Sequence, residues 1–385
     1  MIRISDKSLC SGCSACVTAC PKQCIVLRRD REGFDYPVAN PDLCIGCGLC
    51  ERICPVLHPA DKVEPLAAYA ARSKDDLLTA SSGGVFPLLA EEFVSEGGTV
   101  CGAKLDESCD VVHCAVSEPD GLDVLRGSKY VQSDLYSIFE DVKAELEGGG
   151  NVLFSGTPCQ VAGLNSYLGK DYEGLLTVDL ACHGVPGPGL WTLYRKAVEE
   201  KYGDRLENLV FRDKTQSWRH YDIRYGFKNA SIRVPASEDP YMALFFQDMT
   251  LRPSCYECRL RNGRSGSDIT LADLWNVPEA APGMNDDRGV SGVLVNTPKG
   301  QAWVKRIASR LHLRETDPQL LKAQNGGFAE SVLVPESRAE FFKGIHSTRD
   351  LYGWMKSFVV RKPLIVRLYR SVRSALSKFK RRLFK

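Results

Sequence analysis

Apolar runs of strand length alternate with amphipathic stretches of helical spacing over residues 151–345. Alternation between these two periods is typical of a mixed α/β domain, in which helices cover a sheet. The runs predicted as strands are 151–155, 175–180, 208–212, 221–227, 269–275 and 292–296, and those predicted as helices are 188–202 and 299–311.

Residues 65–148 show a similar alternation. An apolar run at 66–71 predicts a strand, and apolar positions at helical spacing predict helices at 85–95 and 133–147. Three consecutive glycines at 148–150 end the second helix and mark a boundary. We therefore divide the chain into the segments 1–60, 65–150, 151–345 and 350–385, of which the first is dense in cysteine and the last is basic and amphipathic.

The composition narrows the class of protein. The chain has 385 residues, 44% apolar and 25% charged, so we expect a globular protein of two or three domains rather than a collagen-like or disordered one. No run of 18 consecutive apolar residues occurs, and residues 1–20 lack an apolar stretch of the signal-peptide type. We therefore expect a soluble protein that acts in the cytoplasm.

The net charge of +2 hides an asymmetry, because residues 350–385 carry a net charge of +10 and leave −8 on residues 1–349. From Pro363 onward, apolar residues recur at helical spacing among lysines and arginines. A basic amphipathic helix is typical of contact with an anionic membrane, here its inner face, or with an acidic partner. A helix packed on the domain with a solvated charged face explains the pattern equally well.

Nine of the sixteen cysteines lie within the first sixty residues and form a repeat with an offset of 34 residues. The spacing Cys-x2-Cys-x2-Cys-x3-Cys-Pro begins at Cys10 and again at Cys44. Cytosolic thiols stay reduced, and soft thiolates suit iron. Zinc sites or disulfides would not explain two such runs, each followed by proline.

This spacing resembles that of the bacterial two-cluster ferredoxins, in which the fourth cysteine of each run ligates the other cluster. The resemblance implies an α+β ferredoxin-like domain over residues 1–60 with two [4Fe-4S] clusters. It assigns Cys10, Cys13, Cys16 and Cys54 to one cluster, and Cys44, Cys47, Cys50 and Cys20 to the other. Cys24 is surplus, and we interpret it as an ordinary buried thiol.

The other seven cysteines fall into two sets. Three lie in strand-like sequence and are interpreted as small buried apolar residues, namely Cys101, Cys109 and Cys114. Cys159 and Cys182 each follow a predicted strand, where open α/β sheets place their sites, and Cys255 and Cys258 form a Cys-x2-Cys pair ringed by arginines. These four thiolates suffice for a further cluster, with a zinc site or a thioredoxin-like dithiol as alternatives.

Residues from about 66 to 300 resemble the coenzyme F-420 hydrogenase/dehydrogenase beta-subunit family. The matching segments are Thr79-Ala-Ser-Ser-Gly-Gly84, Gly127-Ser-Lys-Tyr-Val-Gln-Ser133, Ser155-Gly-Thr-Pro-Cys-Gln160, Cys182-His-Gly-Val-Pro186, Cys255-Tyr-Glu-Cys258 and Ser267-Asp-Ile-Thr-Leu-Ala-Asp-Leu-Trp275. The family includes beta subunits of deazaflavin-reducing hydrogenases and the plant 7-hydroxymethyl chlorophyll a reductase. Ala272 departs from the family's Gly-Asp-Phe/Leu-Trp pattern, where a backbone that needs glycine would be affected.

The resemblance implies a mixed α/β flavin-binding catalytic domain that uses FAD and one iron–sulfur cluster. Carried onto this chain, it makes Cys159, Cys182, Cys255 and Cys258 the ligands of a third cluster. It also favours a flavin site over an ordinary N-cap and a solvated loop. The expected contacts are Ser81, Ser82, Gly83 and Gly84 to the pyrophosphate at a helix start, then Lys129, Tyr130 and Gln132, and Gly156, Thr157, Pro158 and Gln160.

Three further side chains keep two interpretations each. His183 is a proton donor or, more simply, a hydrogen-bonded structural histidine. Arg212 and Lys214 either meet an anionic substrate or belong to a solvated face. No residue is singled out as catalytic.

Together these features predict an iron–sulfur flavoprotein oxidoreductase. It would pass electrons from a ferredoxin-type donor through [4Fe-4S] clusters to FAD and on to an organic acceptor such as a deazaflavin. The main alternative is a non-catalytic electron-transfer subunit of a larger hydrogenase or dehydrogenase complex. The sequence has no nucleic-acid-binding module and no G-x-G-x-x-G fingerprint for direct NAD(P)H binding.

Overall fold

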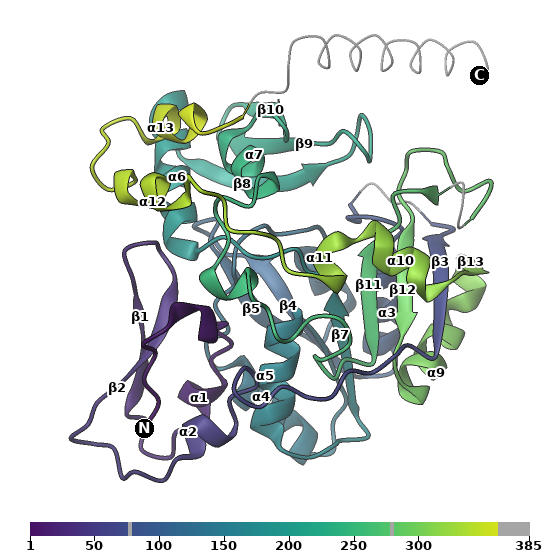
Figure 1. Cartoon of the computed structure of the whole chain (residues 1–385). Helices are drawn as coiled ribbons and strands as arrows, with labels where there is room; N and C mark the ends of the chain where they lie inside the picture. The colour runs from purple at the N-terminus through teal and green to yellow at the C-terminus, as the bar shows by residue number, and fades with distance from the viewer. Residues whose placement is uncertain (76–78, 278–280, 361–385) are drawn as a thin grey trace, which may run out of the picture.

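The computed structural model describes residues 1–75, 79–277 and 281–360, which surround an eight-stranded sheet (Figure 1). The strand order is β13-β3-β12-β11-β7-β6-β4-β5. The strands are β3 (Ala67–Ser73), β4 (Thr99–Leu105), β5 (Val111–Val116), β6 (Val152–Ser155), β7 (Leu175–Leu180), β11 (Ile269–Asp273), β12 (Ser291–Val295) and β13 (Leu311–Glu315).

The sheet is mixed, which confirms the predicted α/β class. Strands β4, β6, β7 and β11 are parallel to their neighbours in this series. Strand β12 is antiparallel to both β11 and β3, so β3 runs in the same direction as β11. The carboxyl ends of β3, β11, β7, β6 and β4 therefore lie at one edge, which we call the carboxyl edge of the sheet. The glycines at 148–150 lie just before β6, and the strands on both sides of them in the sequence belong to this one sheet.

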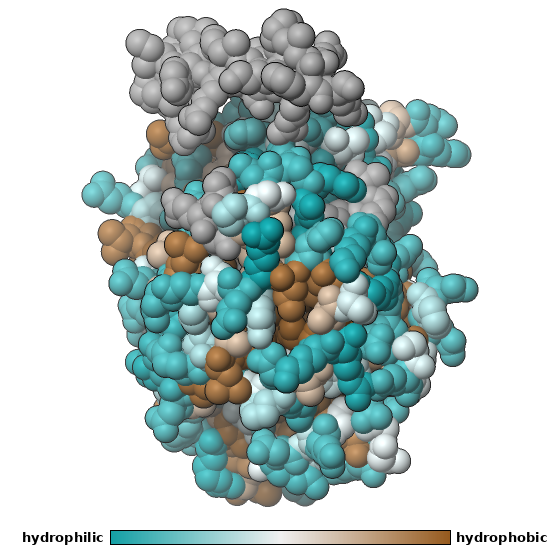
Figure 2. Space-filling model, turned by 90° about the vertical axis from the view of Figure 1, so that its right-hand side faces the viewer, coloured by the Kyte–Doolittle hydropathy of each residue, from teal (hydrophilic) through white to brown (hydrophobic). Residues whose placement is uncertain are grey.

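Helices cover both faces of the sheet, because the central strands carry apolar side chains on both faces. Leu153 and Leu176 belong to the same core cluster as α3 (Val85–Ser95) and pack with α9 (Pro298–Ile307) on one face. The neighbouring Phe154 and its cluster pack against α4 (Ile138–Glu147) and α5 (Pro158–Leu168) on the other face. Figure 2 shows the flank that carries β13 and α9, where polar side chains predominate and apolar ones are scattered.

A second, three-stranded antiparallel sheet lies beside the first, with the order β10-β9-β8. Its strands are β8 (Leu206–Asp213), β9 (Asp222–Phe227) and β10 (Ser231–Pro235). Trp191, Tyr194 and Tyr241 form its aromatic core, in which each is fully buried. The surrounding helices are α6 (Pro188–Tyr202), α7 (Pro240–Phe246), α12 (Arg338–Gly344) and α13 (Leu351–Ser357), while α10 (Pro318–Gln324) and α11 (Gly326–Ala329) lie near the large sheet.

The N-terminal residues form a small cysteine-rich domain of two short helices and one hairpin. These elements are α1 (Ala15–Thr18), α2 (Leu49–Arg52), β1 (Ile25–Arg29) and β2 (Asp35–Ala39). The tip of the hairpin docks on α6 and α12, where Arg338 pairs with Glu32 at 2.6 Å and Gly33 meets the start of α6. Helix α1 packs on α5, so this domain touches both the small-sheet region and a helix that covers the large sheet.

Several predicted elements keep their bounds, including 85–95, 175–180 and 188–202. The helix predicted over 133–147 is wrong at its start, because Asp134 forms a bridge with Val112 and the helix begins only at Ile138. The helix predicted over 299–311 ends at Ile307 and gives way to a 3-10 turn and β13. The remaining 3-10 helices are Lys7–Leu9, Pro119–Leu125 and Pro253–Cys255.

No helix within the described ranges is long and apolar enough to cross a membrane. The amphipathic pattern from Pro363 onward lies outside the described residues.

Replacing Gly33 tests the docking of the N-terminal hairpin. Gly33 has φ +86°, and a Cβ there would lie 2.6 Å from the backbone nitrogen of Leu190. We expect Gly33→Ala to lower the free energy of unfolding by about 3 kcal/mol, since left-handed strain and steric overlap add. Gly203→Ala is the control, because Gly203 has φ +71° but open space around it, and about 1 kcal/mol is expected there. Equal losses in urea unfolding would contradict this account of the docking.

Candidate iron–sulfur centres

The first group of cysteines comprises Cys10, Cys13, Cys16 and Cys54, whose residues line one pocket at the start of α1. Burial raises the pKa of Cys13 to about 11, and the neighbouring Cys10 and Cys54 add to the shift. Such thiols stay protonated at neutral pH until a metal ion or cluster replaces the proton. The structure thus brings together the four side chains that the resemblance to two-cluster ferredoxins assigns to one cluster.

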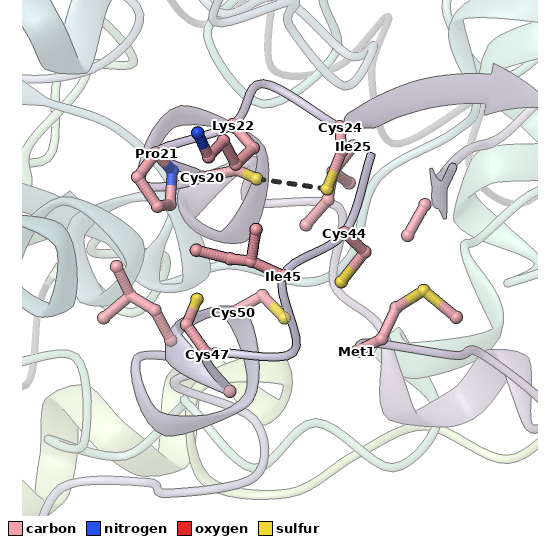
Figure 3. A pocket seen from close by; sticks show the side chains of 13 residues that line it. Met1, Cys20, Pro21, Lys22, Cys24, Ile25, Cys44, Ile45, Cys47 and Cys50 are labelled. Atoms are coloured by element: carbon pink, nitrogen blue, oxygen red, sulfur yellow. Dashed lines mark hydrogen bonds between the residues drawn. The ribbon is translucent and has the colours of Figure 1, made fainter. Parts of the chain in front are cut away.

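The second group comprises Cys20, Cys44, Cys47 and Cys50, and Figure 3 shows their sulfur atoms around a second pocket. Cys47 is exposed, so this group is open to solvent. Cys24 is buried, as expected, but its Sγ lies 3.4 Å from the Sγ of Cys20, so it is a fifth thiol in the wall of this pocket.

The third group joins residues that are far apart in sequence. Cys159 lies in the first turn of α5 after β6, and Cys182 follows β7. Cys255 ends the 3-10 helix Pro253–Cys255, and Cys258 follows this helix. All four line one pocket. Burial raises the pKa of Cys159 to about 12 and that of Cys255 to about 11, while Arg252 and Arg261 oppose the shift at Cys255.

The three groups form a continuous series. Cys16, Cys20 and Cys50 belong to one apolar cluster, which links the first two groups. Cys54 of the first group and Cys159 and Cys258 of the third pack against another, made of Val56, Ala162 and Leu260. The order from the exposed Cys47 inward is therefore second, first and third.

The described residues contain no set of three or more His, Cys, Asp or Glu side chains close enough to hold a single metal ion. A four-iron cluster needs a wider arrangement, because each thiolate binds a different iron at a corner of the cube.

The first predicted flavin segment lies at the carboxyl edge of the sheet, after β3. The backbone nitrogen of Gly83 donates to Ser291 Oγ at 3.0 Å, and a Cβ on Gly83 would lie 2.3 Å from the carbonyl oxygen of Ala71. Gly83 is thus required for close packing at this edge. The Oγ atoms of Ser81 and Ser128 lie 2.9 Å apart, so this segment meets the second predicted segment, 127–133.

The second segment turns its side chains in different directions. Lys129 Nζ donates to the carbonyl oxygens of Val124 and Arg126, and burial lowers the pKa of Lys129 to about 8. Tyr130 lies with its hydroxyl 3.3 Å from that of Tyr221. Gln132 points toward the N-terminal domain, where its Nε2 donates to the carbonyl oxygen of Ser11 at 2.9 Å.

The third segment forms the corner between β6 and α5, and Pro158 is the first residue of the helix. Thr157 and Gln160 close a capping box, and Gln160 Nε2 donates to Ser133 Oγ at 2.8 Å. Thr157 Oγ1 lies 3.1 Å from Cys159 Sγ. Gly156, at the start of this corner, lies against the Gln160 side chain. A hydrogen-bonded corner therefore connects the third cysteine group with segment 127–133.

Arg212 and Lys214 are 6% and 7% exposed, so the solvated-face interpretation of these residues is wrong. Arg212 Nη1 pairs with Asp273 Oδ2 at 2.8 Å, and its guanidinium lies over the rings of Tyr221 and Trp275. Among the described residues, its buried Nε and Nη2 have no hydrogen-bond partner. Lys214 Nζ donates to the carbonyl oxygen of Ser82 at 3.0 Å, next to the first flavin segment.

The structure also bears on the expectations for His183 and Ala272. His183 Nε2 lies 2.5 Å from Asp248 Oδ1, which agrees with a hydrogen-bonded histidine. Ala272, at the position where the family pattern has glycine, lies in regular strand β11 opposite Gly292, and its Cβ lies 3.5 Å from where a Cβ on Gly292 would be. The strand accepts alanine at this position.

Family models match two parts of the chain. Residues 9–57 match the 4Fe-4S dicluster domain, and residues 149–319 match the family described as the C terminus of the coenzyme F420 hydrogenase/dehydrogenase beta subunit. The chain is therefore an iron–sulfur electron-transfer protein in which a dicluster domain precedes a region related to the F420 hydrogenase/dehydrogenase beta subunit.

One solved structure with similarity to the chain is a xenon derivative of the F420-reducing [NiFe] hydrogenase complex from Methanosarcina barkeri. The matching chain has a TM-score of 0.46 and 17% sequence identity, and the match covers 69% of this chain and 90% of that one. Similarity at this level supports no inference about function. A comparison with curated proteins gives no match.

His113 provides a test of the corner that holds Cys159. Burial lowers the pKa of His113 to about 4 from 6.5, and the neutral ring bonds Ser155 and Ser133. The unfolded chain takes up a proton near pH 6.5 and the folded chain does not, so the stability from this group is present above pH 6.5 and is lost as pH falls toward 4. The loss should be on the order of 3 kcal/mol.

We expect His113→Gln to abolish this acid-dependent loss in urea unfolding measured between pH 7 and pH 5, because a neutral amide takes up no proton there. The exposed His312 supplies the control, and His312→Gln should retain the wild-type pH dependence. An unchanged pH dependence in His113→Gln would contradict the assignment.

Proposed function

We propose that this chain is an FAD- and [4Fe-4S]-dependent oxidoreductase that transfers electrons from a ferredoxin-type protein donor to an organic acceptor. The observation that carries the proposal is the unbroken series of cysteine groups, from the exposed Cys47 to the third group beside the carboxyl edge of the sheet. Open α/β sheets bind their ligands at this edge.

The ligand assignments follow from the three groups. Cys10, Cys13, Cys16 and Cys54 would hold one cluster, Cys20, Cys44, Cys47 and Cys50 the second, and Cys159, Cys182, Cys255 and Cys258 the third. The match to a dicluster domain supports two clusters. Four thiols around one pocket, with the 7%-exposed Arg261 beside them, support a third.

The residues at the carboxyl edge fit a flavin. A flavin can accept electrons one at a time from clusters and pass them as a pair to an organic acceptor. The Ser81 and Ser128 hydroxyls and the start of α3 would hold phosphate oxygens. Two nitrogens of buried Arg212, Nε and Nη2, have no hydrogen-bond partner among the described residues and suit ring carbonyl oxygens as acceptors. Lys129, with its pKa lowered to about 8, would hold or release a proton near neutral pH. Gln132 and Gln160 would fix the positions of these segments through their hydrogen bonds to Ser11 and Ser133.

A second candidate function is that of an electron-transfer subunit without an acceptor site of its own. It is favoured by the name of the matching family, which describes a beta subunit of hydrogenases and dehydrogenases. The purified chain, given a chemical reductant, would then reduce no deazaflavin acceptor until a partner subunit is added. An oxidoreductase complete in one chain would reduce the acceptor alone.

We further propose a cytoplasmic location in which residues 361–385 adsorb to the inner face of the membrane. Helix α13 buries Met355 against the domain, so the deletion should begin after Val360. We expect the full chain, and not the deletion variant, to co-sediment with vesicles that contain anionic lipid. Equal sedimentation of both would contradict a membrane role.

Metal and flavin content test the cofactor assignment. We expect about twelve iron atoms and one FAD per chain after anaerobic purification, because three four-iron clusters are assigned. Cys159→Ala should lower the iron content by about four atoms. Cys101→Ala is the matched control, since Cys101 is buried in β4 and lines none of the three pockets, and its iron content should equal that of the wild type. A content of only eight iron atoms in the wild type would contradict the third cluster. A lack of flavin would contradict the assignment as an FAD-dependent oxidoreductase.

A further inference from the structure

Arg252 is the residue that connects the first cysteine group with the third. Its side chain is 1% exposed and lies at the contact between the N-terminal domain and the rest of the chain. Its Nε donates to the carbonyl oxygen of Cys10 at 2.7 Å, and its Nη2 lies 3.8 Å from Cys10 Sγ. Its backbone carbonyl accepts from the nitrogen of Cys255 at 2.8 Å, and its side chain lines the pocket of the third group.

The guanidinium is held in one orientation by neutral acceptors. Nη1 donates to Gln132 Oε1 at 3.0 Å, and Nη2 donates to the carbonyl oxygen of Asp35 at 2.9 Å. The ring of Tyr36 lies 4.3 Å from the guanidinium carbon. Gly12 leaves the room for this arrangement, because a Cβ there would lie 2.8 Å from Nη1.

The charged groups around Arg252 indicate which group its positive charge stabilises. In the described ranges, no carboxylate oxygen lies within 4.0 Å of its guanidinium nitrogens. A buried cation is costly unless an opposite charge lies near it, and the nearest such group is the sulfur of Cys10, which is anionic as a metal ligand. Arg252 therefore faces the first cysteine group with a full positive charge in a dry environment.

We propose that Arg252 sets the redox potential of the centre held by Cys10, and so its ability to accept an electron from the second group and release it toward the third. The proposal rests on the proposed function. A reduced four-iron centre carries one more negative charge than the oxidised one, so a buried positive charge and a hydrogen bond to sulfur both stabilise the reduced form and raise the potential.

Potentiometry followed by electron paramagnetic resonance on anaerobic protein tests the proposal. Arg252→Gln should lower the midpoint potential of one centre, with about a tenfold loss in its reduced-to-oxidised ratio, or about 59 mV for one electron. The shift should persist in a Cys159→Ala background, because the affected centre is the first and not the third. Arg28→Gln removes an exposed arginine of the same domain and should leave all potentials unchanged.

A second variant keeps Arg252 in place. Gln132→Glu has nearly the same shape and puts a carboxylate beside Nη1, so it should compensate the charge and lower the same potential. If Arg252→Gln loses iron and its potential cannot be measured, the potential of Gln132→Glu tests the proposal instead. A purely structural role would change the iron content or the unfolding midpoint and leave the potentials alone.

Full cluster content with wild-type potentials in Gln132→Glu and in any iron-replete Arg252→Gln would overturn this proposal and leave the proposed function intact. Wild-type protein without cluster signals would overturn the proposed function as well.

Discussion

The close packing of α1 against α5 determines how the cysteine groups are arranged. A Cβ on Gly163 would lie 2.9 Å from the Cβ of Cys13, so the helix can approach the first group only with glycine at this position. Cys159 lies four residues earlier, on the same face of the helix. One rigid helix therefore contacts the first group and carries a member of the third, and its capping box at Thr157 fixes where the helix begins.

Buried cations accompany the buried sulfur atoms. Arg252 donates to the carbonyl oxygen of Cys10, and Arg261 donates to that of Cys255. Both are nearly inaccessible to solvent, so their charges are effective over short distances in a medium of low polarity. Thiolate-bound clusters carry net negative charge, and the arginines would offset part of the cost of burying the proposed clusters. At the carboxyl edge, Arg212 and Lys214 repeat this arrangement for the site where an organic ligand is proposed.

The sequence alone could predict those features that depend on local spacing. The repeat at Cys10 and Cys44 needs only short loops, and the amphipathic pattern of 188–202 gives helix α6 with the same bounds. Features that depend on distant contacts were less accessible. Arg212 and Lys214 occur in polar sequence, yet Tyr221 and Trp275 cover Arg212, and Ser82 binds Lys214. The role of Gln132 depends on Arg252, which lies 120 residues away, and no local pattern indicates that contact.

The central claim is that these cysteines hold three four-iron clusters in series. Mössbauer spectroscopy of anaerobic protein enriched in the iron-57 isotope tests it most directly, because it distinguishes iron in four-iron clusters from other iron. We predict that essentially all the iron gives the four-iron signal, with about three clusters per chain. Iron bound as single ions, or protein that contains zinc instead of iron, would contradict this claim.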